Sequence, residues 1–174
     1  MTLYSYIIQH DTGGAPNADD GILSLAICKP GIRKGAVVGD YLVGISGCNL
    51  KLHSNIKQII FIAKITEIML MKDYAIQYPK RQDSIYSEEL ELLPNKFHNC
   101  CNVESDLKGI NVLLSDDFIY FGTKHIDVPT ELTGIIPGRQ YKKNASYMDI
   151  FLTKFREYKN NHGIGKIGKY NQTD

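Results

Sequence analysis

Short apolar runs separated by polar turns dominate the first half of the chain. Residues 3–9, 23–28, 41–46 and 58–71 are rich in aliphatic, β-branched and aromatic side chains. This composition favours strands over helices, although the last run is long enough to hold a strand that leads into a helix. The pattern predicts a sheet built largely from the N-terminal half.

Apolar positions change to helical spacing near the C-terminus. Ser146 and Asp149 precede them in a capping-box pattern, and Gly163 follows them. These signals predict a helix over residues 147–161, and a shorter helix is predicted over residues 72–78. The side chains at helical spacing are Met148, Phe151, Leu152, Phe155 and Tyr158.

The region between these helices predicts a loop and a pair of strands. Residues 83–106 carry six acidic side chains against one lysine, which indicates a solvated, loop-rich segment. Apolar runs at 111–114 and 118–121 bracket the turn-forming segment Ser115-Asp116-Asp117. This spacing predicts a β-hairpin.

Strand and helix do not alternate regularly, so the chain favours an α+β fold over a doubly wound sheet. We expect one domain over residues 1–174, with a small curved or barrel-like mixed sheet and a C-terminal helix. The Gly39-Asp40 turn ahead of the strand at 41–46, and the long apolar run after it, are similar to the pattern of PUA-like barrels such as the ASCH and EVE domains.

Composition narrows the class of protein. The formal net charge of +1 argues against a uniformly basic nucleic-acid coat. No apolar run approaches the roughly 18 residues of a membrane span, and the chain begins without a signal-peptide pattern. We therefore expect a cytoplasmic protein without a membrane partner.

The four cysteines lack paired Cys-x-x-Cys spacing, so we expect reduced thiols, no metal and no other cofactor. A zinc site is a less favoured alternative, for which the chain offers Cys48, His53, His98, Cys100 and Cys101.

A basic turn is the first candidate ligand contact. Lys29, Arg33 and Lys34 lie close together, with no acidic residue between them, ahead of the Gly39-Asp40 turn. A guanidinium offers a planar fork of donors and an ammonium offers a compact charge, so Lys29 and Arg33 could bind a phosphate. A solvated basic turn explains the same residues.

Three polar side chains after the first strand, Asp11, Thr12 and Asn17, could hydrogen-bond the edge of a base, although Asx turns account for Asp11 and Asn17 equally well. Ser46 and Gly47 end the third strand, where a missing side chain lets a ligand approach the backbone. A turn that simply ends the strand is the alternative for this pair.

Asp117 and Tyr120 are candidates in the second half of the chain. Aromatic rings such as Tyr120 can stack on a nucleobase, but part of this strand must fill the core because successive strand residues face opposite sides. Carboxylates such as Asp117 can act as acids or bases, yet neighbouring carboxylates on one strand tip would diverge.

Established catalytic motifs are missing from the sequence: it has no nucleophile elbow, no P-loop, no dinucleotide fingerprint and no zinc-deaminase signature. Asp11, Asp117 and His10 are weak acid/base candidates, and Cys28 beside Lys29 could be an activated thiol. Structural roles explain the same residues, and Cys28 ends an apolar run, which favours burial.

Several short motifs occur in an order that resembles the nucleotide modification associated domain family of the second type. The resemblance implies an α+β domain that acts in bacterial and phage systems for modifying nucleotides or DNA bases. The motifs are Tyr4-Ser5-Tyr6, Asp11-Thr12-Gly13, Ala15-Pro16-Asn17, Cys28-Lys29-Pro30, Ile32-Arg33, Val38-Gly39-Asp40, Ser115-Asp116-Asp117-Phe118 and Tyr120-Phe121-Gly122.

Three functions are compatible with these features. We favour a non-catalytic module whose groove, edged by Lys29, Arg33 and the basic C-terminal helix, binds a nucleotide or a modified base in nucleic acid. The second hypothesis is an enzyme that acts on a nucleotide or base. The third is a protein-interaction subunit of a modification or phage-defence system.

Overall fold

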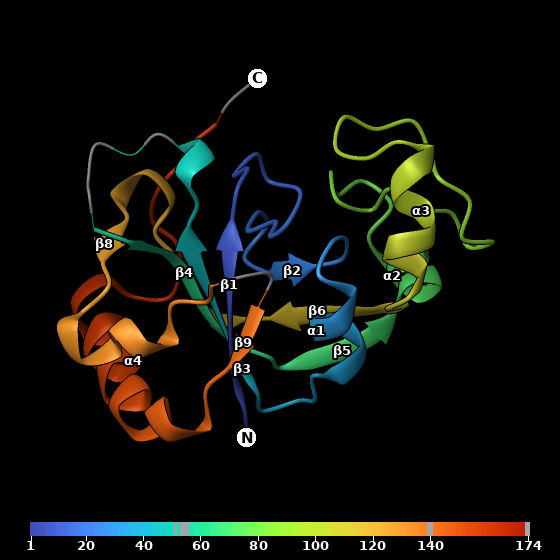
Figure 1. Ribbon diagram of the computed structural model, residues 1–174. Coiled ribbons are helices and arrows are strands. Elements are labelled where there is room, and N and C mark those ends of the chain that lie inside the picture. The colour runs from blue at the N-terminus through green and yellow to red at the C-terminus, as the bar shows by residue number, and fades with distance from the viewer. Residues whose placement is uncertain (51, 53–55, 139–140, 173–174) are drawn as a thin grey trace.

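Two sheets form the frame of the protein in the computed structural model, which describes residues 1–50, 52, 56–138 and 141–172 (Figure 1). The larger sheet has the strand order β10-β7-β4-β3-β1-β9, and β8 also pairs with β4. Its strands are β1 (Leu3–Ile8), β3 (Tyr41–Ser46), β4 (Gln58–Lys64), β7 (Asp117–Tyr120), β8 (Ile126–Asp127), β9 (Tyr141–Lys143) and β10 (Gly165–Lys166).

The larger sheet is mixed and open. Strands β1 and β3 run parallel, from Leu3 opposite Tyr41 to Ile8 opposite Ser46, and β10 runs parallel to β7. The other pairs are antiparallel. The predicted α+β fold with a mixed sheet is therefore confirmed, and β9 and β10 remain separate edges within the described residues, so no barrel closes.

The smaller sheet is antiparallel, and its strands run across the direction of β1 and β4 (Figure 1). It consists of β2 (Leu23–Leu25), β6 (Asn111–Ser115) and β5 (Glu67–Leu70). Leu23, Leu25 and Leu113 belong to one buried cluster with Tyr6 and Tyr120 of the larger sheet. The smaller sheet thus covers one face of the larger one.

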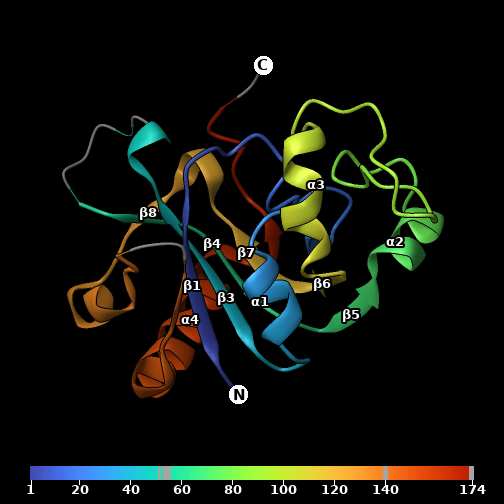
Figure 2. The same cartoon turned by 45° about the vertical axis from the view of Figure 1, so that its right-hand side comes forward.

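The helices lie on both sides of this pair of sheets (Figure 2). Helix α4 (Met148–His162) packs with the 3₁₀ helices η3 (Thr130–Ile135) and η4 (Ala145–Tyr147) against the free face of the larger sheet. Helices α1 (Pro30–Gly35), α2 (Met71–Gln77) and α3 (Cys100–Leu107) lie on the side of the smaller sheet. The 3₁₀ helices η1 (Cys48–Leu50) and η2 (Gly122–Lys124) lie in links between strands of the larger sheet.

Both faces of the central strands are buried, which explains their nearly continuous apolar sequences. In β7, Phe118 and Tyr120 pack toward the smaller sheet, whereas Ile119 packs toward α4. Phe151 and Phe155 supply the buried side of α4, as the helical spacing of its apolar residues predicts. Among the described residues, no helix is long and apolar enough to cross a membrane.

Most predicted elements are confirmed, and the exceptions have clear causes. The strand at 41–46 and the C-terminal helix form as expected, the latter shifted by one residue. The predicted hairpin is wrong: β6 pairs with β2 and β5, while β7 pairs with β4 and β10. The run at 58–71 is likewise divided between the two sheets, as β4 and β5, before it enters α2.

Two local predictions also need correction. The basic turn at 29–35 forms the short helix α1, and the loop-rich segment at 83–106 ends in α3. At α4, the predicted capping box is not formed, because Tyr147 occupies the N-cap position and makes no side-chain cap.

Candidate active-site groove

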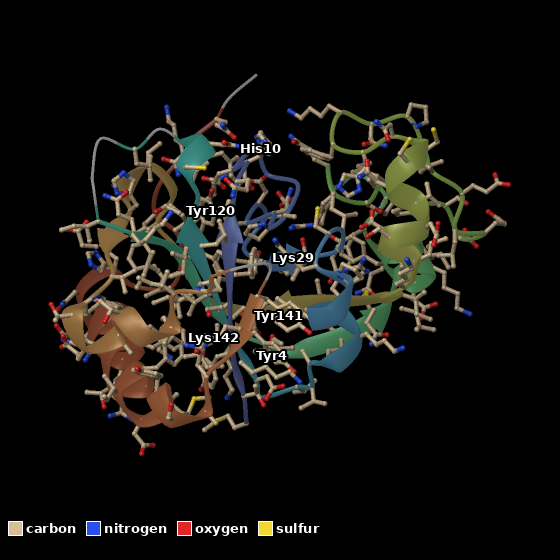
Figure 3. The ribbon with its side chains drawn as sticks, viewed as in Figure 1. Tyr4, His10, Lys29, Tyr120, Tyr141 and Lys142 are labelled. Carbon is tan, nitrogen blue, oxygen red and sulfur yellow. The ribbon has the colours of Figure 1, made fainter. Side chains whose placement is uncertain are left out.

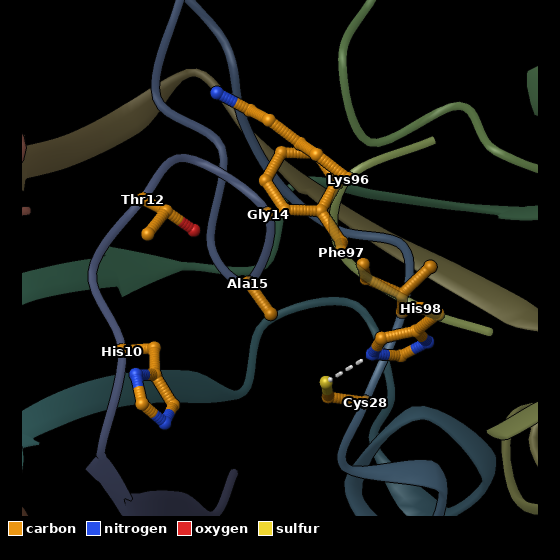
Figure 4. A pocket seen from close by; sticks show the side chains of 9 residues that line it. His10, Thr12, Gly14, Ala15, Cys28, Lys96, Phe97 and His98 are labelled. Atoms are coloured by element: carbon orange, nitrogen blue, oxygen red, sulfur yellow. Dashed lines mark hydrogen bonds between the residues drawn. The ribbon is translucent and has the colours of Figure 1, made fainter. Parts of the chain in front are cut away.

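A groove opens between the loop that follows β1, the link between β2 and α1, and the segment that leads into α3 (Figure 4). It contains a cavity of about 280 Å³ and an adjoining one of about 180 Å³, which share His10, Ala15 and Cys28. The other lining residues are Thr12, Gly14, Ile27, Lys96, Phe97 and His98 in the first cavity, and Tyr6, Ile7, Ile8, Gln9 and Lys29 in the second.

Cys28 lies where the chain turns from the smaller sheet into a helix. Both Cys28 (φ 58°) and Lys29 (φ 44°) are in the left-handed region, which residues other than glycine rarely adopt. The half-buried thiol faces the groove. This arrangement resembles the strand-to-helix turn on which some hydrolases present a nucleophile.

Arg33 holds this turn from behind. Its side chain is fully buried, its Nε donates to the Cys28 carbonyl at 2.7 Å, and its Nη2 donates to the Asp106 carbonyl at 2.7 Å. Its Nη1 donates to the carbonyls of Gly109 and Asn111. The prediction of Arg33 as a phosphate ligand is therefore wrong, because its donors are used by backbone carbonyls inside the protein.

A chain of hydrogen bonds links Cys28 to a buried carboxylate. Cys28 Sγ lies 3.1 Å from His98 Nε2, and His98 Nδ1 lies 2.6 Å from Asp106 Oδ2 (Figure 4). Asp106 also accepts from the Cys28 N–H at 2.8 Å and from the Tyr86 hydroxyl at 2.9 Å. Thiol, imidazole and carboxylate are thus connected in the order of a nucleophile, its base and the group that orients the base.

The charges in this chain reinforce one another. The hydrogen bond that His98 makes to Asp106, together with the one between His98 and Cys28, raises the pKa of His98 to about 10, so the imidazole is protonated at neutral pH. Burial alone would raise the pKa of Asp106, but its hydrogen bonds with His98, the Cys28 N–H and Tyr86 lower it below its ordinary value. A charged imidazole therefore lies between the carboxylate of Asp106 and the sulfur of Cys28.

Lys29 and Tyr6 form the floor of the adjoining cavity. Lys29 Nζ lies 5.1 Å from the centre of the Tyr6 ring, and Figure 3 shows Lys29 below His10. Tyr6 is fully buried, and its hydroxyl makes no hydrogen bond to any part of the chain that the structure describes. Burial raises the pKa of that hydroxyl, and Cys28 and Asp11 raise it further, so the group stays neutral.

Phe97 and Lys96 form the outer wall. The Phe97 ring packs so closely on Gly14 that a side chain at position 14 would come within 2.7 Å of it. Lys96 Nζ lies 5.6 Å from the centre of the same ring. The groove therefore combines a flat aromatic ring with lysines and histidines, and no carboxylate is among the described residues that line it.

Asp11 and Tyr120, both predicted ligand contacts, are buried and bond to each other. The Tyr120 hydroxyl donates to Asp11 Oδ1 at 2.5 Å, and the backbone N–H of Asn171 donates to Asp11 Oδ2 at 3.0 Å. The pair ties the loop after β1 to β7 and the C-terminal segment. Tyr120 has no exposed face on which a base could stack, so that prediction is wrong.

Asn17 belongs to a second, closed polar cluster. Its side chain donates to the Gly13 carbonyl at 2.9 Å and accepts from Arg81 Nη2 at 2.6 Å. Arg81 also bonds the Tyr74 hydroxyl and lies 3.6 Å from Asp83. Asn17 is 1% exposed, so it stabilises the fold and does not reach a base edge.

Of the remaining predicted residues, some line the groove and the others lie away from it. Thr12 and His10 line the groove with Lys29. Ser46 and Gly47 line a separate cavity of about 270 Å³, where Ser46 Oγ accepts the Gln58 N–H.

Asp117 pairs with Lys159 of α4 at 3.0 Å and lines neither groove cavity. The basic helix α4 covers the opposite face of the larger sheet, which excludes it as an edge of this groove.

No set of three or more histidine, cysteine or acidic side chains among the described residues could hold a metal ion. Cys48, Cys100 and Cys101 are exposed free thiols. His53, the remaining zinc candidate besides His98, lies outside the described residues.

Sequence reasoning missed the partners of Cys28. His98 and Asp106 are separated from it by about seventy residues or more and lie in a segment that its acidic composition marks as a loop. Their spacing of eight residues matches no known short motif. The one available signal was the pairing of Cys28 with Lys29 ahead of Pro30, which suggests a thiol at the start of a helix.

One family model matches the sequence. It is described as nucleotide modification associated domain 2, and it matches residues 1–92 and 86–172. Neither the comparison with curated proteins nor that with solved structures returned a match.

Proposed function

Because the chain belongs to the nucleotide modification associated domain 2 family, we propose that the groove beside Cys28 binds a nucleotide or a single exposed nucleobase with its phosphate. The family name associates the domain with nucleotide modification. The observation that carries the proposal is the lining of the groove: Lys96 and the protonated His98 line the main cavity with the flat ring of Phe97, and Lys29 lines the adjoining cavity. No carboxylate is among the described residues that line either cavity.

The chemistry of each part suits one piece of such a ligand. Aromatic rings stack on bases of any sequence, and lysines bind phosphate as point charges. The main cavity of about 280 Å³ is close to the lower limit of roughly 300 Å³ for ordinary ligand pockets. That size suits one base or one mononucleotide and is too small for a duplex.

Calorimetric titration with the monophosphates of adenosine, guanosine, cytidine and thymidine at low salt tests the proposal. We expect at least one to bind, Lys29→Ala to weaken that binding about tenfold, or about 1.4 kcal/mol, and added salt to weaken it further. Lys34→Ala is the matched control, because Lys34 lies in the helix that follows Lys29 and is exposed. If none of the four binds, or if both variants weaken binding equally, the groove is not a nucleotide site.

A further inference from the structure

Beyond ligand binding, we propose that Cys28 is a catalytic nucleophile that attacks a carbonyl carbon, with His98 as its acid and base and Asp106 as the positioning residue. The substrate class is an ester or amide seated in the groove. The inference depends on the hydrogen-bonded chain Cys28–His98–Asp106 and on the groove that gives access to its thiol. It holds whether or not that ester or amide is part of a nucleotide.

Each step of the reaction has a group to perform it. The Cys28 thiolate attacks the carbonyl carbon, a C–S bond forms, and the π electron pair moves to the carbonyl oxygen. When the C=O bond re-forms, the bond to the alcohol or amine breaks, and that leaving group takes a proton from His98 Nε2. Water then attacks the thioester and gives a proton to His98, which releases a carboxylic acid and restores the thiolate.

Tyr6 is the residue that suits the developing oxyanion. Its hydroxyl is buried, neutral and without a hydrogen-bond partner in the described structure, and its ring lines the same cavity as Cys28. A buried hydroxyl without a partner costs free energy unless a ligand uses it. A transition-state oxyanion would accept the missing hydrogen bond, and a single donor of this kind contributes about 10²- to 10³-fold in rate.

The surroundings of Cys28 fix its geometry before substrate arrives. Arg33 holds the Cys28 carbonyl and Asp106 holds its N–H, so the left-handed backbone of the residue is bonded on both sides. Asp106 holds the His98 ring through Nδ1, which leaves Nε2 directed at the sulfur. Preorganisation of this kind places reacting groups without cost at the moment of reaction.

The test uses p-nitrophenyl acetate, an activated ester without a nucleotide. We expect a burst of p-nitrophenolate and the addition of one acetyl group to intact wild-type protein, located on Cys28 by peptide mass spectrometry. Cys28→Ser should abolish the burst, and Cys100→Ser, which removes an exposed thiol, should leave it unchanged. Asp106→Asn should shift the pH profile of acetylation, which a merely structural role would not do.

Tyr6→Phe separates catalysis from folding. Removing a hydroxyl that lacks a partner should leave the melting temperature unchanged or higher, while acetylation slows about 10²-fold. The proposal is overturned if acetyl groups on wild-type protein are spread over Cys48, Cys100 and Cys101, or if Tyr6→Phe acetylates at the wild-type rate. Because the probe carries no nucleotide, failure of the nucleotide titration would leave this result unaffected.

Discussion

Two polar clusters on the side of the smaller sheet contain the same kinds of residues and differ in where they end. Each joins an arginine, a tyrosine and a buried carboxylate: Arg33, Tyr86 and Asp106 in one, and Arg81, Tyr74 and Asp83 in the other. Apart from the surface ion pair of Arg81 with Asp20, the Asp83 cluster closes on Ser24 and Asn17, which are both buried. The Asp106 cluster continues through His98 to Cys28 and reaches the groove.

This difference indicates that a polar cluster becomes a candidate functional site when one of its ends reaches the groove. The residue types alone do not distinguish such a cluster from a structural one. In the closed cluster, burial raises the pKa of Asp83, and its hydrogen bonds with Ser24 and Tyr74 are internal. In the open cluster, the terminal groups are a thiol and an imidazole that solvent and ligands can reach. The two clusters should therefore respond differently to substitution.

The largest expected effect is on the closed cluster. Arg81→Ala leaves the buried Asp83 without its cation, which should lower the free energy of unfolding by about 3–5 kcal/mol. Urea denaturation measures this change. Lys80→Ala is the control, because Lys80 is a neighbouring exposed cation whose loss should cost within about 0.5 kcal/mol. Equal losses in the two variants would contradict the role given to the cluster.

A smaller loss of stability is expected in the open cluster. His98→Gln removes one charged partner of Asp106, which keeps Arg33, Tyr86 and the Cys28 N–H. We expect a cost of about 1.5–3 kcal/mol, typical of a hydrogen bond to a charged group. His125→Gln, at a half-buried histidine outside both clusters, should cost less. A His98→Gln variant as unstable as Arg81→Ala would remove the distinction between the clusters.

The contribution of the open cluster to stability should depend on pH through His98. The pKa of His98 is raised from 6.5 to about 10, so the folded state holds the extra proton between these values. Its contribution to stability is complete below about pH 6.5 and is lost as the pH rises toward 10.

Denaturation of wild-type protein and His98→Gln across this window measures the contribution of His98. The groups that face His98 are Cys28 and Asp106, with Arg33 and Tyr86 behind Asp106, with Lys96 on the same segment as His98, and with His10 across the groove. A wild-type excess in stability that grows with pH would contradict the ion pair.

The smallest expected effect lies outside both clusters. The ion pair between Asp117 and Lys159 is more than a quarter exposed on both side chains. Asp117→Ala should therefore cost at most about 1 kcal/mol and leave acetylation of Cys28 unchanged. A large loss of acetylation would contradict the conclusion that Asp117 lies outside the site.

The elements of the fold could be predicted from local pattern, whereas the pairing between them could not. The strand at Tyr41–Ser46 and the helix at Met148–His162 follow from their own periodicity. The Asp116 turn resembles a hairpin turn, but β6 and β7 separate because each finds partners far along the chain in a different sheet. Sequence spacing carries no record of such long-range pairing.

The residues of the site were harder to predict than the elements of the fold, because their roles depend on long-range contacts. Lys29 and Thr12 were expected as ligand contacts and His10 as a weak acid/base candidate, and the fold places all three along the groove. Arg33 and Asn17 are residue types that often contact ligands, but the fold buries both of them. Their burial is decided by packing against residues up to seventy-eight positions away in the sequence. His98 and Asp106 acquire their roles only when α3 is placed beside Cys28.

The most direct test of the central claim is the order in which the four cysteines of the wild-type protein react with iodoacetamide at about pH 6, followed by peptide mass spectrometry. Cys48, Cys100 and Cys101 are exposed, whereas Cys28 is half buried, so accessibility alone predicts that Cys28 reacts last. The His98–Asp106 pair beside its sulfur predicts that Cys28 reacts first, by about tenfold or more, because a neighbouring charged imidazole activates a thiol. Reaction of Cys28 after the three exposed thiols would contradict the account.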